Sequence, residues 1–256
     1  MGVGIDEAIE VFVRGFSFKR SRTHPYVPER IGPAWVMRDA PRGGKAPTYR
    51  REEWVAWGID AADLHALAAE HTRGRYAICA IRAPGEAEGP LRQAYKQLGY
   101  RLGATEALMV HRLDRIPRTK APARITRVTT PELAGRLARA TESKALEEAA
   151  LSRDAPLRQY VALDGDEPVG WVQSIVVRTE TSGDAAPMTW CADMFVQPSH
   201  RRRGIGRALL ERMLRDDSQR GAAAAVLLAS HDGAKLYPVM GYDQIGQLYL
   251  YSPTRR

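Results

Sequence analysis

The stretch that most constrains the fold is Val196–Arg207, which reads VQPSHRRRGIGR. An apolar run, Met188–Val196, precedes it and predicts a strand, and an amphipathic segment, Ile205–Gln219, follows and predicts a helix. Between them lies a tight turn that contains two glycines and a cluster of arginines. The first N–H groups of a helix are unpaired and carry partial positive charge, and glycines let a phosphate approach the backbone. The stretch is therefore a candidate anion cradle.

Length and composition indicate a chain that is long and apolar enough to form a hydrophobic core. The 256 residues are a prior for one large or two ordinary domains, and 44% of them are hydrophobic. No apolar run is long enough for a transmembrane helix, and the acidic start of the chain does not resemble a secretory signal. Cys79 and Cys191 lie in apolar, strand-like runs, so we expect buried, reduced thiols and a cytoplasmic location.

The net charge of +8 could indicate nucleic acid, an anionic membrane or a polyanionic small ligand as partner. Arginines are spread along the whole chain, with one dense cluster at Arg201, Arg202 and Arg203. A dispersed excess favours a solvated basic surface, so we expect neither a nucleic-acid nor a membrane partner. The six histidines show no metal-ligand spacing, and no metal site is expected.

The first half of the chain predicts a mixture of strands and helices. Strands are expected at Val11–Phe18, Ala34–Met37 and Arg75–Ile81, and one strand or two at Tyr100–Leu113. Helices are expected at Leu91–Leu98 and at Arg51–Thr72, the latter as one piece or as two that are broken at Gly58, with Asp60 as N-cap of the second.

A segment with two prolines and two basic residues, Ile116–Pro122, predicts a linker between domains at 1–115 and 123–256. After it the expected order is β-α-α-β-β-β-α-β-α-β, with Thr130 as an N-cap in front of Pro131. The last of these strands is expected at Tyr242–Tyr251. Strands and helices in this order predict an α/β or α+β domain with a mixed sheet.

The two halves share a short signature. Ala94–Tyr100 and Leu236–Tyr242 each contain a tyrosine, a glycine four residues later and a second tyrosine directly after it. In both places a strand is expected before the signature and another after it. The chain is therefore predicted to contain two pseudo-repeated halves.

Two motifs resemble those of the GNAT superfamily of N-acetyltransferases. Val196-x-Pro198-x-x-Arg201-x-x-Gly204-x-Gly206 resembles their motif A, and Leu236-Tyr237-x-x-x-Gly241-Tyr242 resembles a later motif. The resemblance covers residues 123–252. It implies a GNAT-like mixed, mostly antiparallel sheet flanked by helices, and acetyl-CoA as cofactor.

The resemblance also implies which residues bind acetyl-CoA. The arginine–glycine turn would bind the pyrophosphate through backbone N–H groups, and the preceding strand would splay from its neighbour and pair with the pantetheine arm. Ser230 stands where the family often has asparagine. The arginine side chains could equally be solvated, and the side chains of the strand could be core. The implied residues are Met194, Phe195, Val196, Arg201, Arg202, Arg203, Gly204, Ile205, Gly206, Arg207 and Ser230.

Two residues are candidates for proton transfer. Tyr237 resembles the general acid of the family, which would protonate the leaving thiolate; a packed aromatic residue is the alternative. Asp193 lies in an apolar run, where a carboxylate is costly unless it faces a cleft. It would deprotonate the amine, directly or through water, or would instead bind and orient it.

The resulting hypothesis is a cytoplasmic N-acetyltransferase in which an amine attacks the thioester directly. The first half lacks the arginine–glycine turn, so it would bind no coenzyme A and would serve as scaffold or acceptor wall. The acceptor would be a small-molecule or peptide amine, and the protein a monomer or homodimer. The alternatives are a catalytically silent acyl-CoA-binding regulatory module and a basic nucleic-acid-binding protein.

Overall fold

The structure, a computed structural model, describes residues 3–21, 23–44, 48–180, 186–231 and 233–254. Contacts divide the chain into two compact units. The C-terminal unit comprises Val110–Leu227 and Lys235–Asp243, and the N-terminal unit consists mainly of Gly4–Met109, Leu228–Ala234 and the chain from Gln244 onward. This division differs from the predicted boundary at 116–122, because the end of the chain is grouped with the first half.

The N-terminal unit is built on a mixed sheet with the strand order β1-β2-β3-β4-β11-β5. Strands β3 and β4 are parallel, whereas the β1–β2, β2–β3 and β4–β11 pairs are antiparallel. The final strand, expected in the C-terminal domain, thus pairs with β4. The bounds are β1 (Tyr26–Ile31), β2 (Ala34–Asp39), β3 (Glu52–Trp57), β4 (Tyr76–Arg82), β5 (Tyr100–His111) and β11 (Asp243–Pro253).

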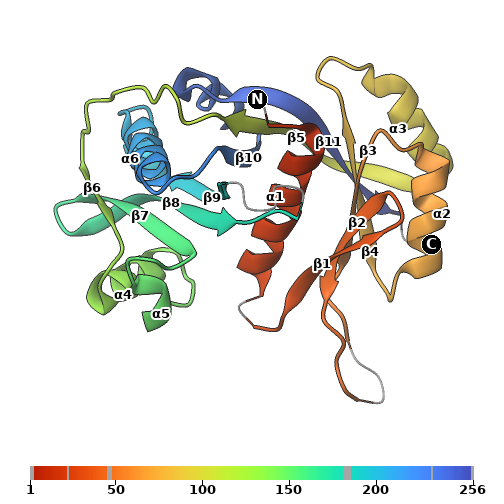
Figure 1. The fold of residues 1–256 in the computed structure, drawn as a ribbon, viewed down its shortest axis with the longest axis horizontal. Helices are drawn as coiled ribbons and strands as arrows, with labels where there is room; N and C mark the ends of the chain where they lie inside the picture. Colours follow the sequence, from red (N-terminus) through yellow and green to blue (C-terminus); the bar gives the residue numbers. More distant parts are fainter. Residues whose placement is uncertain (1–2, 22, 45–47, 181–185, 232, 255–256) are drawn as a thin grey trace. The chain divides into compact units, whose positions relative to one another are not determined.

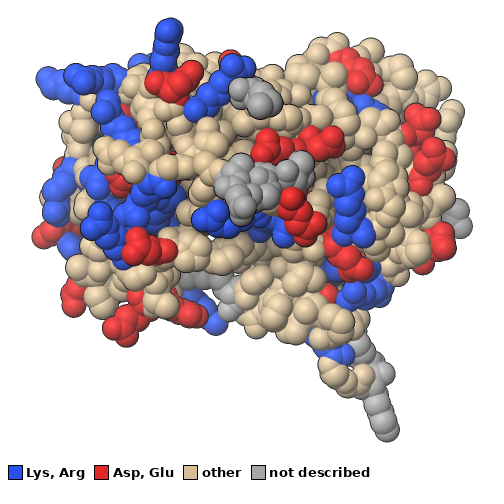
Figure 2. All heavy atoms as spheres, viewed as in Figure 1, with Lys and Arg blue, Asp and Glu red and all other residues tan. Residues whose placement is uncertain are grey.

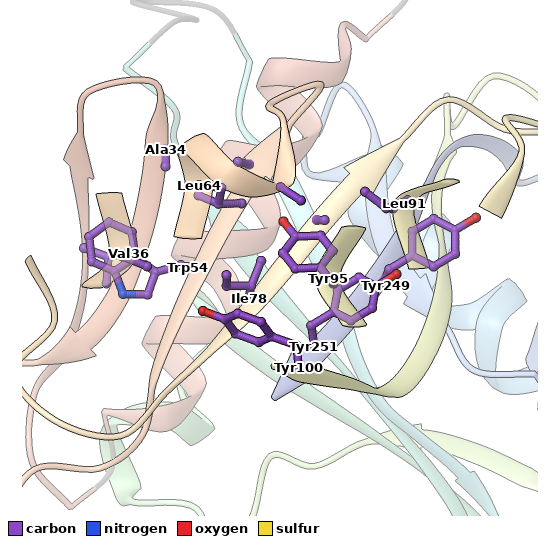
Figure 3. Close-up of a cluster of buried hydrophobic side chains, with 14 residues drawn as sticks. Ala34, Val36, Trp54, Leu64, Ile78, Leu91, Tyr95, Tyr100, Tyr249 and Tyr251 are labelled. Carbon is purple, nitrogen blue, oxygen red and sulfur yellow. The ribbon is translucent and has the colours of Figure 1, made fainter. Parts of the chain in front are cut away.

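Helices cover this sheet on both faces (Figure 1). Helix α1 (Ile5–Arg20) packs on β1 and β2, whereas α2 (Ala61–His71) and α3 (Glu88–Gln97) pack together over a separate core. In that core the Tyr95 and Tyr251 rings are stacked with centroids 4.1 Å apart, and Figure 3 shows them among the other buried side chains. Aromatic packing therefore joins α3 to the last strand of the chain.

Two predictions for this unit were wrong. The predicted strand at 11–18 lies inside α1, where residues such as Ala8, Ile9 and Phe12 follow the spacing of a buried helix face. The predicted helix at 51–72 begins only at Ala61, because 52–57 form β3. Nearly all of β3 is buried, so its sequence lacks the alternation that marks a half-exposed strand.

The C-terminal unit has the strand order β10-β9-β8-β7-β6, and only β9 and β10 are parallel. The predicted fold class, a mostly antiparallel sheet flanked by helices, is confirmed. The elements are β6 (Arg124–Arg127), α4 (Pro131–Ala140), α5 (Glu148–Leu151), β7 (Leu157–Asp164), β8 (Glu167–Val177), β9 (Met188–Val196), α6 (Ile205–Gln219) and β10 (Ala225–Ala229), with 3-10 turns at η1 (Pro198–His200), η2 (Gly233–Lys235) and η3 (Pro238–Met240).

Local capping agrees with the sequence. The Thr130 hydroxyl accepts the N–H of Leu133 at 3.3 Å, which confirms it as the N-cap of α4. Helix α4 packs on β8, α5 packs on β7, and α6 packs on β7, β8 and β9 (Figure 1). The predicted linker is itself held by α6, since the backbone N–H of Thr119 donates to Glu211 at 2.5 Å.

A buried ion pair fixes the C-terminal end of α6 to three strands. The Asp217 carboxylate contacts Arg158 of β7 at 2.8 Å and accepts bonds from Ser174 of β8 at 2.8 Å and Thr189 of β9 at 2.9 Å. All four residues are buried. Burial raises the pKa of Asp217, although Arg158 and the two hydroxyls favour its ionised form. The network therefore sets where α6 lies on the sheet.

Replacing Arg158 with methionine should leave a buried carboxylate without its cation and lower the free energy of unfolding by about 3–5 kcal/mol. Urea denaturation measures this. The double variant Arg158→Met/Asp217→Leu should lose less than the single variant, because it buries no unpaired charge.

The matched control is Arg92→Met, which breaks the solvent-exposed Arg92–Glu88 pair of α3 and should cost under about 1 kcal/mol. A loss for Arg158→Met as small as that of the control would contradict the role assigned to the network.

Candidate functional site

The central feature of the C-terminal unit is a bulge in β9. Trp171 of β8 pairs with Phe195 and Gln173 pairs with Ala192, so Asp193 and Met194 together lie opposite one residue of β8. Asp193 has φ 50°, in the left-handed region. That conformation costs a non-glycine residue roughly 1–2 kcal/mol, and bulges re-aim a strand near functional sites. The bulge thus changes the course of β9 just before the turn.

Beyond its first residues, β9 is not paired with β10. Thr189 pairs with Ala225 and Trp190 with Val226, and within the described residues the β9–β10 register goes no further. The backbone of Phe195 and Val196 is consequently paired with β8 alone, and Met194 lies in the bulge. This is the splayed edge that the resemblance implies.

The turn after β9 ends in an uncapped helix N-terminus. Gly204 is the N-cap of α6 with φ 88°, and no side chain caps this end. A Cβ at Gly204 would meet no atom within 4 Å, so the space beside it is open. At Gly206 a Cβ would lie 3.1 Å from Met194 Cε and 3.3 Å from Leu236 Cδ2. Gly206 therefore lets α6 approach both β9 and the segment that carries Tyr237.

The arginines of the turn differ in what they contact. Arg201 Nε donates to the Val196 carbonyl at 3.0 Å, and its guanidinium lies 5.6 Å from the centroid of the Phe195 ring. Arg202, Arg203 and Arg207 are exposed, and in the described part of the chain none of them is paired with a carboxylate. Arg201 thus orders the turn, and the other three leave it positively charged.

Phe195 is unusually exposed for an aromatic residue of a central strand. Its ring is 37% exposed and stacks on Trp171 with centroids 4.8 Å apart. The neighbouring pair, Gly170 and Val196, faces α6, because a Cβ at Gly170 would contact Leu209 and Ile205 of that helix. Phe195 and Trp171 therefore lie on the opposite face.

Ile205, predicted as part of the cradle, is 3% exposed, so its side chain anchors α6 in the core, leaving only its backbone to meet a ligand.

Tyr237 is buried at the start of η3, with its ring edge-to-face against Tyr242 at 5.6 Å. Tyr242 in turn packs edge-to-face against His111 at 5.2 Å. His111 Nδ1 accepts the backbone N–H of Leu113 at 2.8 Å. No sequence pattern indicated His111, because it lies at the end of β5, far from Tyr237 along the chain.

The remaining predicted residues have fewer contacts that indicate a role. Ser230 follows β10, and its hydroxyl accepts the N–H of Gly233 at 3.4 Å; contacts group it with the N-terminal unit, so its role stays a prediction. Cys79 and Cys191 are free and buried, as expected, and burial raises the pKa of both thiols.

The described residues contain neither a candidate metal site nor a candidate membrane span. No group of three or more His, Cys, Asp and Glu residues there could hold a metal ion. No helix in the same residues is long and apolar enough to cross a membrane.

Comparison with known proteins finds a family model that matches part of the chain. Residues 156–244 match the model of the acetyltransferase (GNAT) domain, so this part of the chain is similar to that family. No curated protein sequence matches the chain.

Solved structures share the fold. A GCN5-related N-acetyltransferase from Kribbella flavida is 17% identical with a TM-score of 0.59, over 100% of this chain and 98% of that one. One from Sphaerobacter thermophilus is 18% identical with a TM-score of 0.54, over 86% of this chain and 76% of that one. A functionally unknown protein from Staphylococcus epidermidis is 16% identical with a TM-score of 0.53, over 78% and 83%. At this identity the likeness concerns the fold.

The stability of the C-terminal unit should fall in mild acid because of His111. Burial lowers the pKa of His111 below its ordinary value of 6.5, although Asp114 and Asp243 act in the opposite direction. The unfolded chain therefore binds the proton more readily, and the free energy of unfolding should drop as the pH falls below that value.

Urea denaturation at about pH 7.5 and about pH 5 tests this, with each variant compared at both pH values. His111→Gln should show a smaller drop than the wild type, whereas His71→Gln, at a half-exposed position, should show the same drop. An unchanged pH dependence in His111→Gln would contradict the assignment.

Proposed function

We propose that the protein is an acetyl-CoA-dependent N-acetyltransferase that transfers the acetyl group to a primary amine. The observation that carries this proposal is the position of the splayed β9 edge directly before the uncapped N-terminus of α6. The first offers main-chain groups to an extended amide-bearing arm, and the second offers N–H donors to a pyrophosphate. A ligand with both parts in this order is coenzyme A.

The chain's own groups fit such a ligand. The backbone of Met194, Phe195 and Val196 would pair with the pantetheine arm, and the N–H groups from Gly204 to Arg207 would hold the pyrophosphate. Gly204 leaves open space there, and Arg202, Arg203 and Arg207 supply unpaired positive charge. Arg201 would act indirectly, by holding Phe195 and the Val196 carbonyl. The Ser230 hydroxyl, at the position where the family often has asparagine, would contact the pantetheine arm or a water.

Two side chains would move protons. When the amine attacks the thioester carbonyl, the departing thiolate takes a proton, and the Tyr237 hydroxyl would donate it. Packing against Tyr242 fixes the Tyr237 ring for this role. Asp193, held in a strained backbone at the bulge, would accept a proton from the ammonium group or orient it.

Direct attack is favoured over a covalent enzyme intermediate. The nearest cysteine in sequence to Asp193 is Cys191, whose thiol is buried and has a raised pKa. A thiol that stays protonated is a poor nucleophile. The acetyl group would therefore pass from the thioester to the amine in one transfer.

The N-terminal half would be a degenerate GNAT-like copy that binds no coenzyme A. The edge-to-face pair of Tyr95 and Tyr100, with centroids 5.6 Å apart, matches that of Tyr237 and Tyr242 at the same spacing. This likeness supports a repeat with domains at 1–115 and 123–256. A cytoplasmic monomer or homodimer, acting on a small-molecule or peptide amine and without a nucleic-acid partner, completes the proposal.

Tyr237→Phe should lower turnover at least about 100-fold while leaving acetyl-CoA affinity unchanged, because only the proton donor is lost. Release of free thiol over a panel of amines measures turnover, and isothermal titration calorimetry measures affinity. Tyr95→Phe removes a buried hydroxyl at the repeat position and should leave both values unchanged.

Equal turnover in Tyr237→Phe and the wild type would remove the proposed acid. Binding of acetyl-CoA without thiol release on any amine would instead favour a catalytically silent acyl-CoA-binding module.

Asp193→Gly should separate stability from activity. Glycine adopts φ 50° without steric cost, so the free energy of unfolding should stay the same or rise by about 1 kcal/mol. Turnover should fall at least about 100-fold, since the carboxylate is lost. Asp193→Asn, which tolerates the same backbone, should show the same loss of turnover. Full activity in either variant would exclude Asp193 from proton transfer.

A further inference from the structure

A polar cavity of about 810 Å³ lies in the C-terminal unit, away from the arginine–glycine turn. It is formed by residues at the end of β6, the loop after α5 and the last turns of α6. Helix α6 has fifteen residues, so its two ends are about 22 Å apart. The cavity is therefore separate from the proposed acetyl-CoA site at the other end of the helix.

Four arginines and two aspartates give this cavity an excess of positive charge. Arg212 pairs with Asp216 at 3.0 Å, and Arg220 contacts Asp154 at 3.5 Å. Arg127 and Arg153 also line the cavity, and neither has a carboxylate partner among the described residues. Two guanidinium groups are thus left without a counter-ion. Figure 2 shows Lys and Arg side chains crowded over the face of this unit that it draws.

Of these two arginines, Arg127 gives the stronger indication of an anionic ligand. Its residue is 8% exposed, and its Nη atoms donate to the carbonyls of Arg153 at 2.9 Å and Ser152 at 2.5 Å. Among the described residues its buried Nε has no acceptor, so one of the five N–H donors of this guanidinium is buried without a partner. Burying a charge that is not neutralised costs free energy.

Neighbouring cations make the cost of Arg127 larger. Burial lowers its pKa, and the positive charges of Arg220 and Arg158 lower it further, whereas Tyr160 and Asp216 act in the opposite direction. An anion in the cavity would reverse these effects. The bonds from Arg127 to Ser152 and Arg153 also hold the loop that carries the Arg153 side chain, so the donors are positioned before any ligand arrives.

We propose that this cavity binds a compact dianion, the phosphate monoester group of a small molecule. The two guanidinium groups without counter-ions match its two charges, and the planar fork of arginine matches the geometry of phosphate oxygens. The site stands independently of acetyl transfer, because none of its residues belongs to the proposed active site.

The arginines that line the cavity also have a second explanation, which the test must exclude. Cations near the C-terminus of a helix neutralise its partial negative charge, and α6 ends beside this cavity. If that were the whole role of the arginines, phosphate would act on the protein only through ionic strength.

The test is titration of inorganic phosphate into the full chain at constant ionic strength and about pH 7.5, with an excess of 3′-dephospho-coenzyme A, which has the pyrophosphate but no phosphate monoester, present to fill the other anion site. We expect saturable binding of one phosphate per chain. Arg153→Ala should weaken it at least about 10-fold, as expected for the loss of a charge-assisted contact. Arg139→Ala, which removes an exposed arginine of α4, should leave it unchanged.

Three results would overturn the proposal. The first is the absence of saturable binding, with phosphate raising the melting temperature no more than chloride of equal ionic strength. The second is equal weakening by Arg153→Ala and Arg139→Ala. The third is phosphate binding that disappears in the Arg202→Ala/Arg203→Ala variant and survives in Arg153→Ala, which would assign the phosphate to the turn before α6.

The same variants separate this proposal from acetyl transfer. Arg202→Ala/Arg203→Ala should weaken acetyl-CoA binding and leave phosphate binding intact, and Arg153→Ala should do the reverse. A chain that binds phosphate at Arg153 but no acetyl-CoA would refute only the proposed function.

Discussion

The candidate site depends on one local constraint, the extra residue in β9. Because Asp193 adopts a left-handed backbone, β9 leaves the register of a regular ladder, and its pairing with β10 ends at Trp190. In the observed register, a regular strand would stay paired with β10 as far as Asp193, opposite Ala229, the last residue of β10. The strain is compensated nearby, since Phe195 stacks on Trp171 and Arg201 bonds the Val196 carbonyl. The strained residue Asp193, the open edge of β9 and the arginine–glycine turn thus depend on one another.

The open strand edge and the turn can form one site only if α6 begins directly beside them. The buried bonds of Asp217 to β7, β8 and β9 fix the far end of the helix, and the absence of a side chain at Gly206 lets its first turn approach Met194 and Leu236. The free N–H groups at the helix start therefore follow directly on the open strand edge. The same helix ends beside the arginine-rich cavity, so the two proposed anion sites lie at its two ends.

The sequence predicted the C-terminal unit well because its signals are local. The glycines of the turn, the Thr130 cap and the Asp193 carboxylate in an apolar strand are each visible within a few residues. Helix α1 and strand β3 were misread because burial on several faces removes the periodicity that distinguishes helix from strand. The pairing of β11 with β4 and the contact of His111 with Tyr242 join distant segments, so no local pattern could indicate them.

The most direct test is hydrogen–deuterium exchange of the full chain with and without acetyl-CoA. One equivalent should bind per chain and slow the exchange of amides in two segments, Met194–Val196 and Gly204–Arg207, because these N–H groups would bond the ligand. The connection between β2 and β3 in the first half should exchange at the same rate in both states. Protection confined to the first half, or no protection in the two segments at saturating acetyl-CoA, would contradict the account.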